Sequence, residues 1–171
     1  MSYLIRKVTR AKWERENNFA LDEIPADAVT VDLRTNSNTL SFWQLEMPSH
    51  NDEICRIALA LATAAERIDR MDLTWIDKNR VSSQGISIKP SDGQTPVKSL
   101  RGNHVDVTTL DLGRLCRVAT WIDEALTQHQ HRRFTRKEII QIITEAVHKN
   151  LVSINDLKDK VRDEIGKEFD N

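Results

Sequence analysis

A helical stripe of apolar residues in the first half of the chain restricts its fold more than any other feature. The stripe recurs every three or four residues, in the order Ile54, Ala58, Leu61, Ala65 and Ile68. This spacing places the side chains on one face of an α-helix. Leu59 and Ala60 add apolar surface on other faces, so we expect a central helix that packs on a sheet or between layers. Ser49 and Asp52 resemble a capping box at its start.

Short segments before and after this helix are typical of β-strands, because some alternate apolar and polar residues and others are apolar-rich or rich in β-forming residues. We expect strands at residues 3–9, 39–47, 72–77, 85–89 and 104–108. Residues 25–35 are ambiguous. Val29, Val31 and Leu33 alternate as in a strand, whereas Pro25 and the acidic residue after it suit the first turn of a helix.

Helical patterns dominate the last third of the chain. A second long helix is expected from Thr108 or Thr109 to about Leu126, and Asp111 is placed to cap it. Thr135 and Glu138 form a T-x-x-E capping box that begins a further helix, and residues 153–156 restart a last one.

These elements predict an α+β fold, with a small, mainly antiparallel sheet covered by two long helices and a C-terminal helical hairpin. We expect residues 1–131 to form the α+β core domain. Residues 132–171 should form the helical hairpin, packed on the same domain.

Composition narrows the class of protein. The 171 residues carry 25 basic and 26 acidic groups, a net charge of -1, which is typical of a folded soluble domain. The longest uncharged run of the first helix, residues 57–65, is shorter than the roughly 20 apolar residues of a membrane span. The first apolar stretch ends at Arg6, too early for a secretory signal, so we expect a cytoplasmic protein with no membrane partner.

The two cysteines, Cys55 and Cys116, each lie on an apolar helical face, so we interpret both as core thiols. Two cysteines without histidines at finger spacing do not form a zinc site. The sequence therefore indicates no metal and no cofactor.

His104 and Asp106 are the weak candidates for catalysis. Their spacing of two places them on one face of a strand, opposite Val105 and Val107. A carboxylate beside an imidazole favours the charged imidazolium and can support acid–base chemistry. A small hydrolase-like enzyme is therefore an alternative function, but a half-solvated sheet carries the same alternation.

Residues 132–137 are the densest basic segment, with Arg132, Arg133, Arg136 and Lys137 around Phe134. A nucleic-acid-binding protein is a further alternative. Residues 153–171 hold six acidic and four basic groups, however, and this excess of negative charge repels phosphate. We therefore do not expect nucleic acid to be the partner.

The helix after Thr135 is apolar over more than one stripe, so we expect its residues Ile139, Ile143 and Val147 to contact protein material beyond its hairpin mate. The alternative is that these three residues pack on the chain's own core. Trp13, among five basic residues, is expected to be exposed and to anchor a contact, with Arg132 and Arg133 as further partner-binding residues.

The N-terminal charges are split. Residues 1–15 have a balance of +4, and residues 16–33 hold five acidic groups with no Lys or Arg. The two segments either neutralise each other or form a docking surface of two signs. The function that we expect is a cytosolic, non-catalytic protein-interaction module: a subunit, an inhibitor or an antitoxin- or immunity-type partner that binds another protein or itself.

Overall fold

Six antiparallel strands form a single sheet in the order β4-β5-β2-β1-β3-β6. The computed structural model describes residues 2–15, 20, 23–48 and 50–169. The strands are β1 (Tyr3–Val8), β2 (Leu40–Leu45), β3 (Met71–Asp77), β4 (Ser87–Pro90), β5 (His104–Thr108) and β6 (His131–Phe134). The first five confirm the predicted strands.

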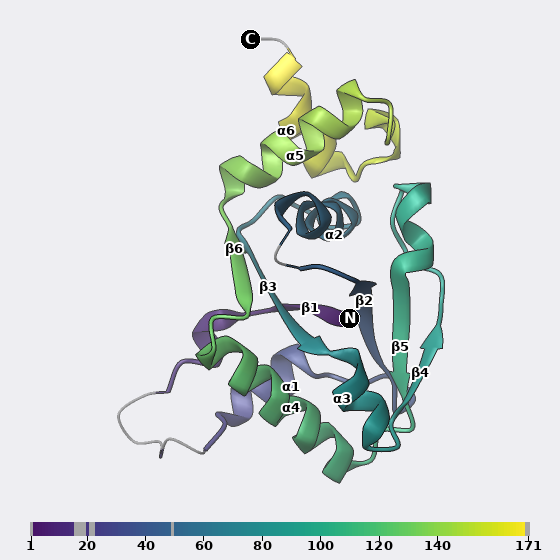
Figure 1. The fold of residues 1–171 in the computed structure, drawn as a ribbon. Helices are drawn as coiled ribbons and strands as arrows, with labels where there is room; N and C mark the ends of the chain where they lie inside the picture. The colour runs from purple at the N-terminus through teal and green to yellow at the C-terminus, as the bar shows by residue number, and fades with distance from the viewer. Residues whose placement is uncertain (1, 16–19, 21–22, 49, 170–171) are drawn as a thin grey trace.

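Helices cover both faces of the sheet (Figure 1). One face holds α2 (Asn51–Thr63), with α5 (Arg136–His148) and α6 (Asp159–Phe169) packed beyond it. The other face holds α1 (Ala26–Asp32), α3 (Lys78–Ser83) and α4 (Leu112–Thr127). Short 3-10 turns lie at η1 (Arg10–Lys12), η2 (Lys98–Asn103) and η3 (Ile154–Asp156). The α+β class, the antiparallel sheet and the contact between α5 and α6 are confirmed.

Several predicted helix starts are observed. The Asp111 side chain caps α4 by accepting a hydrogen bond from the Arg114 N–H at 2.7 Å. Thr135 and Glu138 form the complete capping box of α5. Ser49, the expected cap of α2, lies outside the described residues, and His50 is at the N-cap position.

The ambiguous segment 25–35 is helical, as α1. A strand there would pair with the next strand, β2, as a hairpin, but both edges of β2 already pair with β1 and β5. The helix instead buries Ala28 and leaves Val31 52% exposed.

Trp13 is buried, with 4% of its surface exposed, so the expectation of an exposed anchor is wrong. Its indole N–H donates to Asp32 Oδ2 at 2.7 Å. The same carboxylate accepts hydrogen bonds from the Thr9 N–H at 2.7 Å and the Thr9 hydroxyl at 2.9 Å. The turn at η1 thus folds Trp13 against the end of α1, a long-range contact that local charge density does not reveal.

Residues 131–134 form an edge strand that the sequence pattern did not predict. β6 pairs with β3, and Arg133 donates to the buried Asp72 carboxylate at 2.8 Å. The boundary expected between residues 131 and 132 therefore falls inside a strand of the main sheet. The helical pair itself begins at Arg136.

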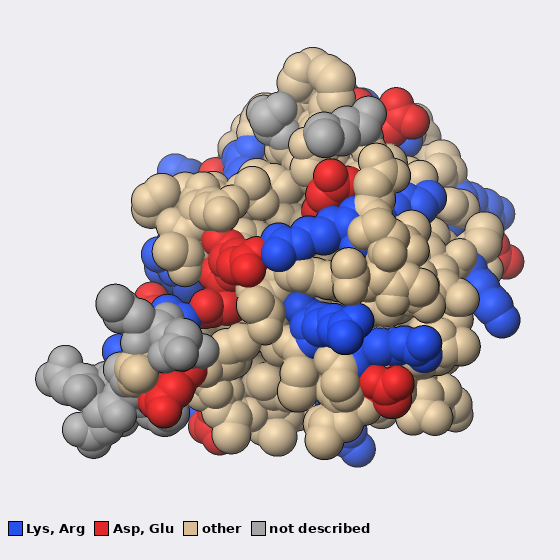
Figure 2. All heavy atoms as spheres, turned by 60° about the horizontal axis from the view of Figure 1, so that its bottom comes forward, with Lys and Arg blue, Asp and Glu red and all other residues tan. Residues whose placement is uncertain are grey.

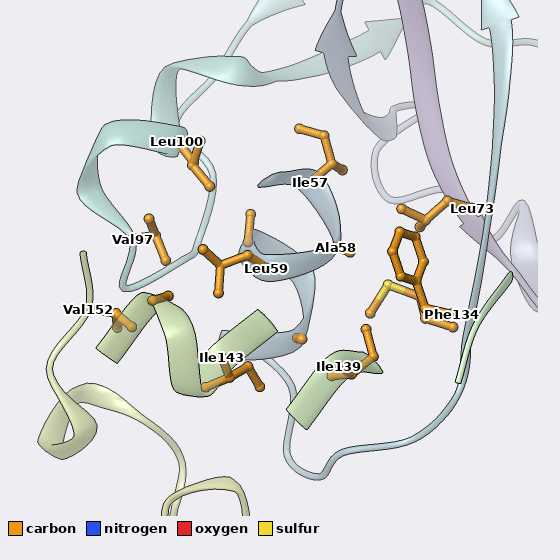
Figure 3. Close-up of a cluster of buried hydrophobic side chains, with 14 of the residues drawn as sticks. Ile57, Ala58, Leu59, Leu73, Val97, Leu100, Phe134, Ile139, Ile143 and Val152 are labelled. Atoms are coloured by element: carbon orange, nitrogen blue, oxygen red, sulfur yellow. The ribbon is translucent and has the colours of Figure 1, made fainter. Parts of the chain in front are cut away.

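Two of the isoleucines of α5, Ile139 and Ile143, are buried within the chain. Ile139 and Ile143 are 1% and 0% exposed, and Figure 3 shows them directed toward α2 and the core that includes Phe134. The expectation that another protein covers these two residues is wrong, because α2 and α6 already do so. The broad apolar surface of α5 reflects its position between those helices.

The cysteines differ from the expected pair of core thiols: Cys55 is half-buried and Cys116 is exposed on α4. Over the described part of the chain, no helix is long and apolar enough to cross a membrane.

Candidate functional site

A groove of about 400 Å³ lies between α2 and α5, and we call it the α2–α5 groove. Its apolar lining consists of Cys55, Leu59, Ile142, Ala146 and Leu151. Cys55 and Leu59 lie one turn apart on α2, and Ile142 and Ala146 lie one turn apart on α5. The groove is therefore walled by two regular helices, and burial within it raises the pKa of the Cys55 thiol.

Leu151 ends the groove and remains 51% exposed. The end of α5 fixes this position. Asn150 adopts a left-handed conformation, with φ of 56°, and the Leu151 N–H donates to the Ala146 carbonyl at 2.9 Å. The Asn150 N–H donates to the Val147 carbonyl at 3.0 Å, which completes a Schellman motif. The motif holds the Leu151 side chain beside the last turn of α5.

Charged residues surround this apolar lining. Arg132 lies 3.6 Å from Glu138, and Lys149 lies 3.7 Å from Glu145. The Arg132 guanidinium also stacks over the Phe134 ring, 4.3 Å from its centroid. Hydrogen bonds from Thr135 lower the pKa of Glu138, with a smaller contribution from Arg132. These two cations of the groove are therefore paired within the chain.

The six predicted partner-binding residues therefore separate in space. Arg132 lines the groove, and Val147 is half-buried against the core. Ile139, Ile143 and Trp13 are buried. Arg133 is on the opposite face of β6, paired with Asp72. Sequence reasoning missed Leu151, although an asparagine directly after a helical pattern indicates such a C-terminal cap.

The basic segment 132–137 is not a free positive patch. Arg132, Arg133 and Arg136 pair with Glu138, Asp72 and Glu164, respectively. A phosphate backbone would have to compete with these intramolecular pairs. Figure 2, which brings the α4 side of the molecule forward, likewise shows basic and acidic side chains next to one another.

The N-terminal charges are also largely paired inside the chain. Lys12 lies 2.8 Å from Asp27, which joins the basic segment to the acidic one. Arg15 lies 2.6 Å from Asp123 of α4. Acidic residues 16 and 22 of this segment lie outside the described residues. The contacts described favour mutual neutralisation over a two-signed docking surface.

His104 and Asp106 line a second cavity, of about 640 Å³, on the sheet face that carries α2. His104 Nδ1 lies 2.7 Å from the Ser91 hydroxyl, and the Ser41 hydroxyl donates to Asp106 Oδ1 at 3.0 Å. Each of the two residues thus has its own serine partner. Burial lowers the pKa of His104, and the opposing effects of Asp106 and Ser91 are smaller. Burial therefore favours the neutral form of the imidazole.

The described residues contain no group of three or more His, Cys, Asp or Glu side chains placed to hold a metal ion. Comparison of the chain with protein-family models, curated proteins and solved structures finds no match.

Proposed function

We propose that this chain is a protein-interaction module, a subunit or an inhibitor, whose α2–α5 groove receives apolar side chains of a partner. One observation carries the proposal: Leu151 is half exposed at the end of an apolar groove, and Arg132 and Lys149 at its rim already pair with acidic residues of α5. Apolar area is then the surface that gains most from being covered.

The shape of the groove favours a helical partner. Two helices with apolar residues one turn apart form a channel that suits an amphipathic helix, with anchors at intervals of three or four residues. Burial of the exposed half of Leu151 contributes about 1 kcal/mol, from the roughly 1.5–3 kcal/mol of a fully buried leucine. Leu59 and Ile142 provide the floor for a second anchor.

The chain contains a matched pair of exposed leucines for the test. Leu151 is in the groove, and Leu112 is 76% exposed at the start of α4, on the other side of the sheet. Leu151→Asp and Leu112→Asp place the same negative charge on opposite sides of the molecule. We expect both variants to fold, because neither removes a buried side chain.

The wild type and both variants are used to capture partners from an extract of the source cells, and self-association is measured by sedimentation. We expect one stoichiometric partner, or a dimer, that Leu151→Asp loses and Leu112→Asp retains. A partner that binds all three proteins equally, or that only Leu112→Asp loses, contradicts the proposal. So does a wild type that remains monomeric and captures nothing.

A further inference from the structure

The second cavity has the dimensions of a small-molecule site. Its volume of about 640 Å³ falls within the range of small-molecule sites, roughly 300–1,000 Å³. α2 packs over the β1, β3 and β6 side of the sheet, and its residues Ala60 and Ala64 form only one wall of the cavity. The floor is the adjacent part of β1, β2 and β5. We call this the sheet-face cavity.

The wall opposite α2 is held in place by close packing. A Cβ at Gly93 would lie 2.5 Å from the Trp43 ring, so the loop after β4 sits directly on this side chain. Buried Thr95 contacts buried Thr63 of α2, with their hydroxyl oxygens 3.2 Å apart. The cavity is therefore formed before any ligand arrives, which limits the entropy lost on binding.

Two cations that line the cavity have no counterion among the residues that the structure describes. Lys7 of β1 and Arg34, after α1, both line it, and neither forms a salt bridge with any described residue. Most of the chain's other arginines are paired, as at the groove and at β6. An unpaired lysine and arginine facing one cavity favour a ligand with an anionic group.

The remaining polar groups call for hydrogen-bond donors on the ligand. Asp92, Asp106 and Gln94 present carboxylate and amide oxygens to the cavity. A simple anion would be repelled by both carboxylates, so the ligand must also carry hydroxyl or amino groups. Asp106 already faces Lys89 across the β4–β5 pair, and this balance favours neutral hydroxyls over a cationic amine.

From this arrangement we propose that the sheet-face cavity binds a phosphate ester of a small polyol. Lys7 and Arg34 hold the phosphate, and Asp106, Asp92 and Gln94 accept hydrogen bonds from the hydroxyls. His104 keeps Nδ1 engaged with Ser91, which leaves Nε2 for the ligand. The role is that of a binding site and is independent of the α2–α5 groove.

The probes are glucose 6-phosphate, ribose 5-phosphate and glycerol 3-phosphate. Their binding is measured by calorimetry and by the NMR shifts of the Ser41 and Asp106 amides. We expect at least one ester to bind, and glucose and inorganic phosphate to bind at least about tenfold more weakly, since each lacks one set of contacts. The failure of all three esters at millimolar concentration overturns the proposal. Equal binding of an ester and its unphosphorylated polyol, or of inorganic phosphate, does the same.

The double variant Lys7→Gln, Arg34→Gln tests the residues assigned to the phosphate. Both side chains are exposed, so the fold should persist, and we expect affinity for the ester to fall at least about tenfold. Lys98→Gln, an exposed lysine outside the cavity, is the control and should bind like the wild type. Wild-type affinity in the double variant refutes the assignment. Leu151→Asp should retain ester binding, which separates this result from that of the groove.

Discussion

Replacement of Trp13 by phenylalanine should destabilise the fold through one hydrogen bond. The indole N–H is buried and donates to the Asp32 carboxylate at 2.7 Å. A hydrogen bond to a charged group contributes about 1.5–3 kcal/mol. The smaller ring also leaves space in a tightly packed region, which costs about 1 kcal/mol more. We therefore expect Trp13→Phe to lower the free energy of unfolding by about 3 kcal/mol.

Urea denaturation followed by circular dichroism measures this change. With an m-value of about 2 kcal/mol/M, the midpoint should fall by about 1.5 M. A double-mutant cycle with Asp32→Ala, which removes the acceptor oxygens, isolates the interaction between the two side chains, and we expect a coupling of at least about 1 kcal/mol. A loss below about 0.5 kcal/mol, or no coupling in the cycle, refutes the assignment of Trp13 as a structural anchor.

Three other perturbations test the core, a helix cap and the sheet-face cavity. Ile143→Ala should cost about 2–5 kcal/mol in urea unfolding, whereas Leu151→Ala, at an exposed position, should stay within about 0.5 kcal/mol of the wild type. Thr135→Ala should lower the melting temperature, with a loss of about 0.5–2 kcal/mol. Hydrogen bonds from the Thr135 N–H and hydroxyl depress the folded pKa of Glu138, so its stabilisation is present above the unfolded pKa and is lost as pH falls through the folded pKa. Thr135→Ala removes the hydroxyl and keeps the N–H, so the variant should lose part of this acid sensitivity in melts across pH. NMR titration of the His104 ring should give a pKa below 6.5, and the corresponding stability is present above pH 6.5 and lost as pH falls through the folded pKa. Equal losses of unfolding free energy in Ile143→Ala and Leu151→Ala would contradict the first expectation. An unchanged melting temperature in Thr135→Ala would contradict the second, and a His104 titration midpoint at or above 6.5 the third.

Local patterns predicted the elements whose signals lie within a few residues of one another. The capping box of α5 and the Asp111 cap of α4 are examples, because each is formed by residues three apart. Strand β5 could likewise be predicted from its alternation, since Val105 and Val107 are buried and Asp106 between them is less so. Strands β1 and β2 bury residues on both faces of the sheet, and their content of apolar residues predicted them.

Elements that depend on contacts between distant parts of the chain could not be predicted from local patterns. β6 is only four residues long and depends on pairing with β3, about 60 residues earlier. Trp13 lies in a basic segment, and its burial follows from Asp32, 19 residues away. For residues 25–35, the strand alternative is excluded by distant pairing, because β1 and β5 occupy both edges of β2.

The candidate sites show the same division. The sequence placed His104 and Asp106 on one strand face, but Lys7, Arg34 and the loop at Gly93 reach them only through the fold. The sequence showed that the apolar surface of α5 is wide, but it did not show which element packs against that surface. Helix α2 buries most of it, and Leu151, just after α5, remains half exposed.

The late position of β6 and α5 in the chain has a consequence for biosynthesis. The ribosome releases β1, β2, α2 and β3 well before Phe134, Ile139 and Ile143, which close the same hydrophobic cluster. Until those side chains emerge, the outer side of α2 and the free edge of β3 are uncovered on the nascent chain. Slow translation past residue 80 should therefore prolong an aggregation-prone stage, and chaperone demand should be highest there.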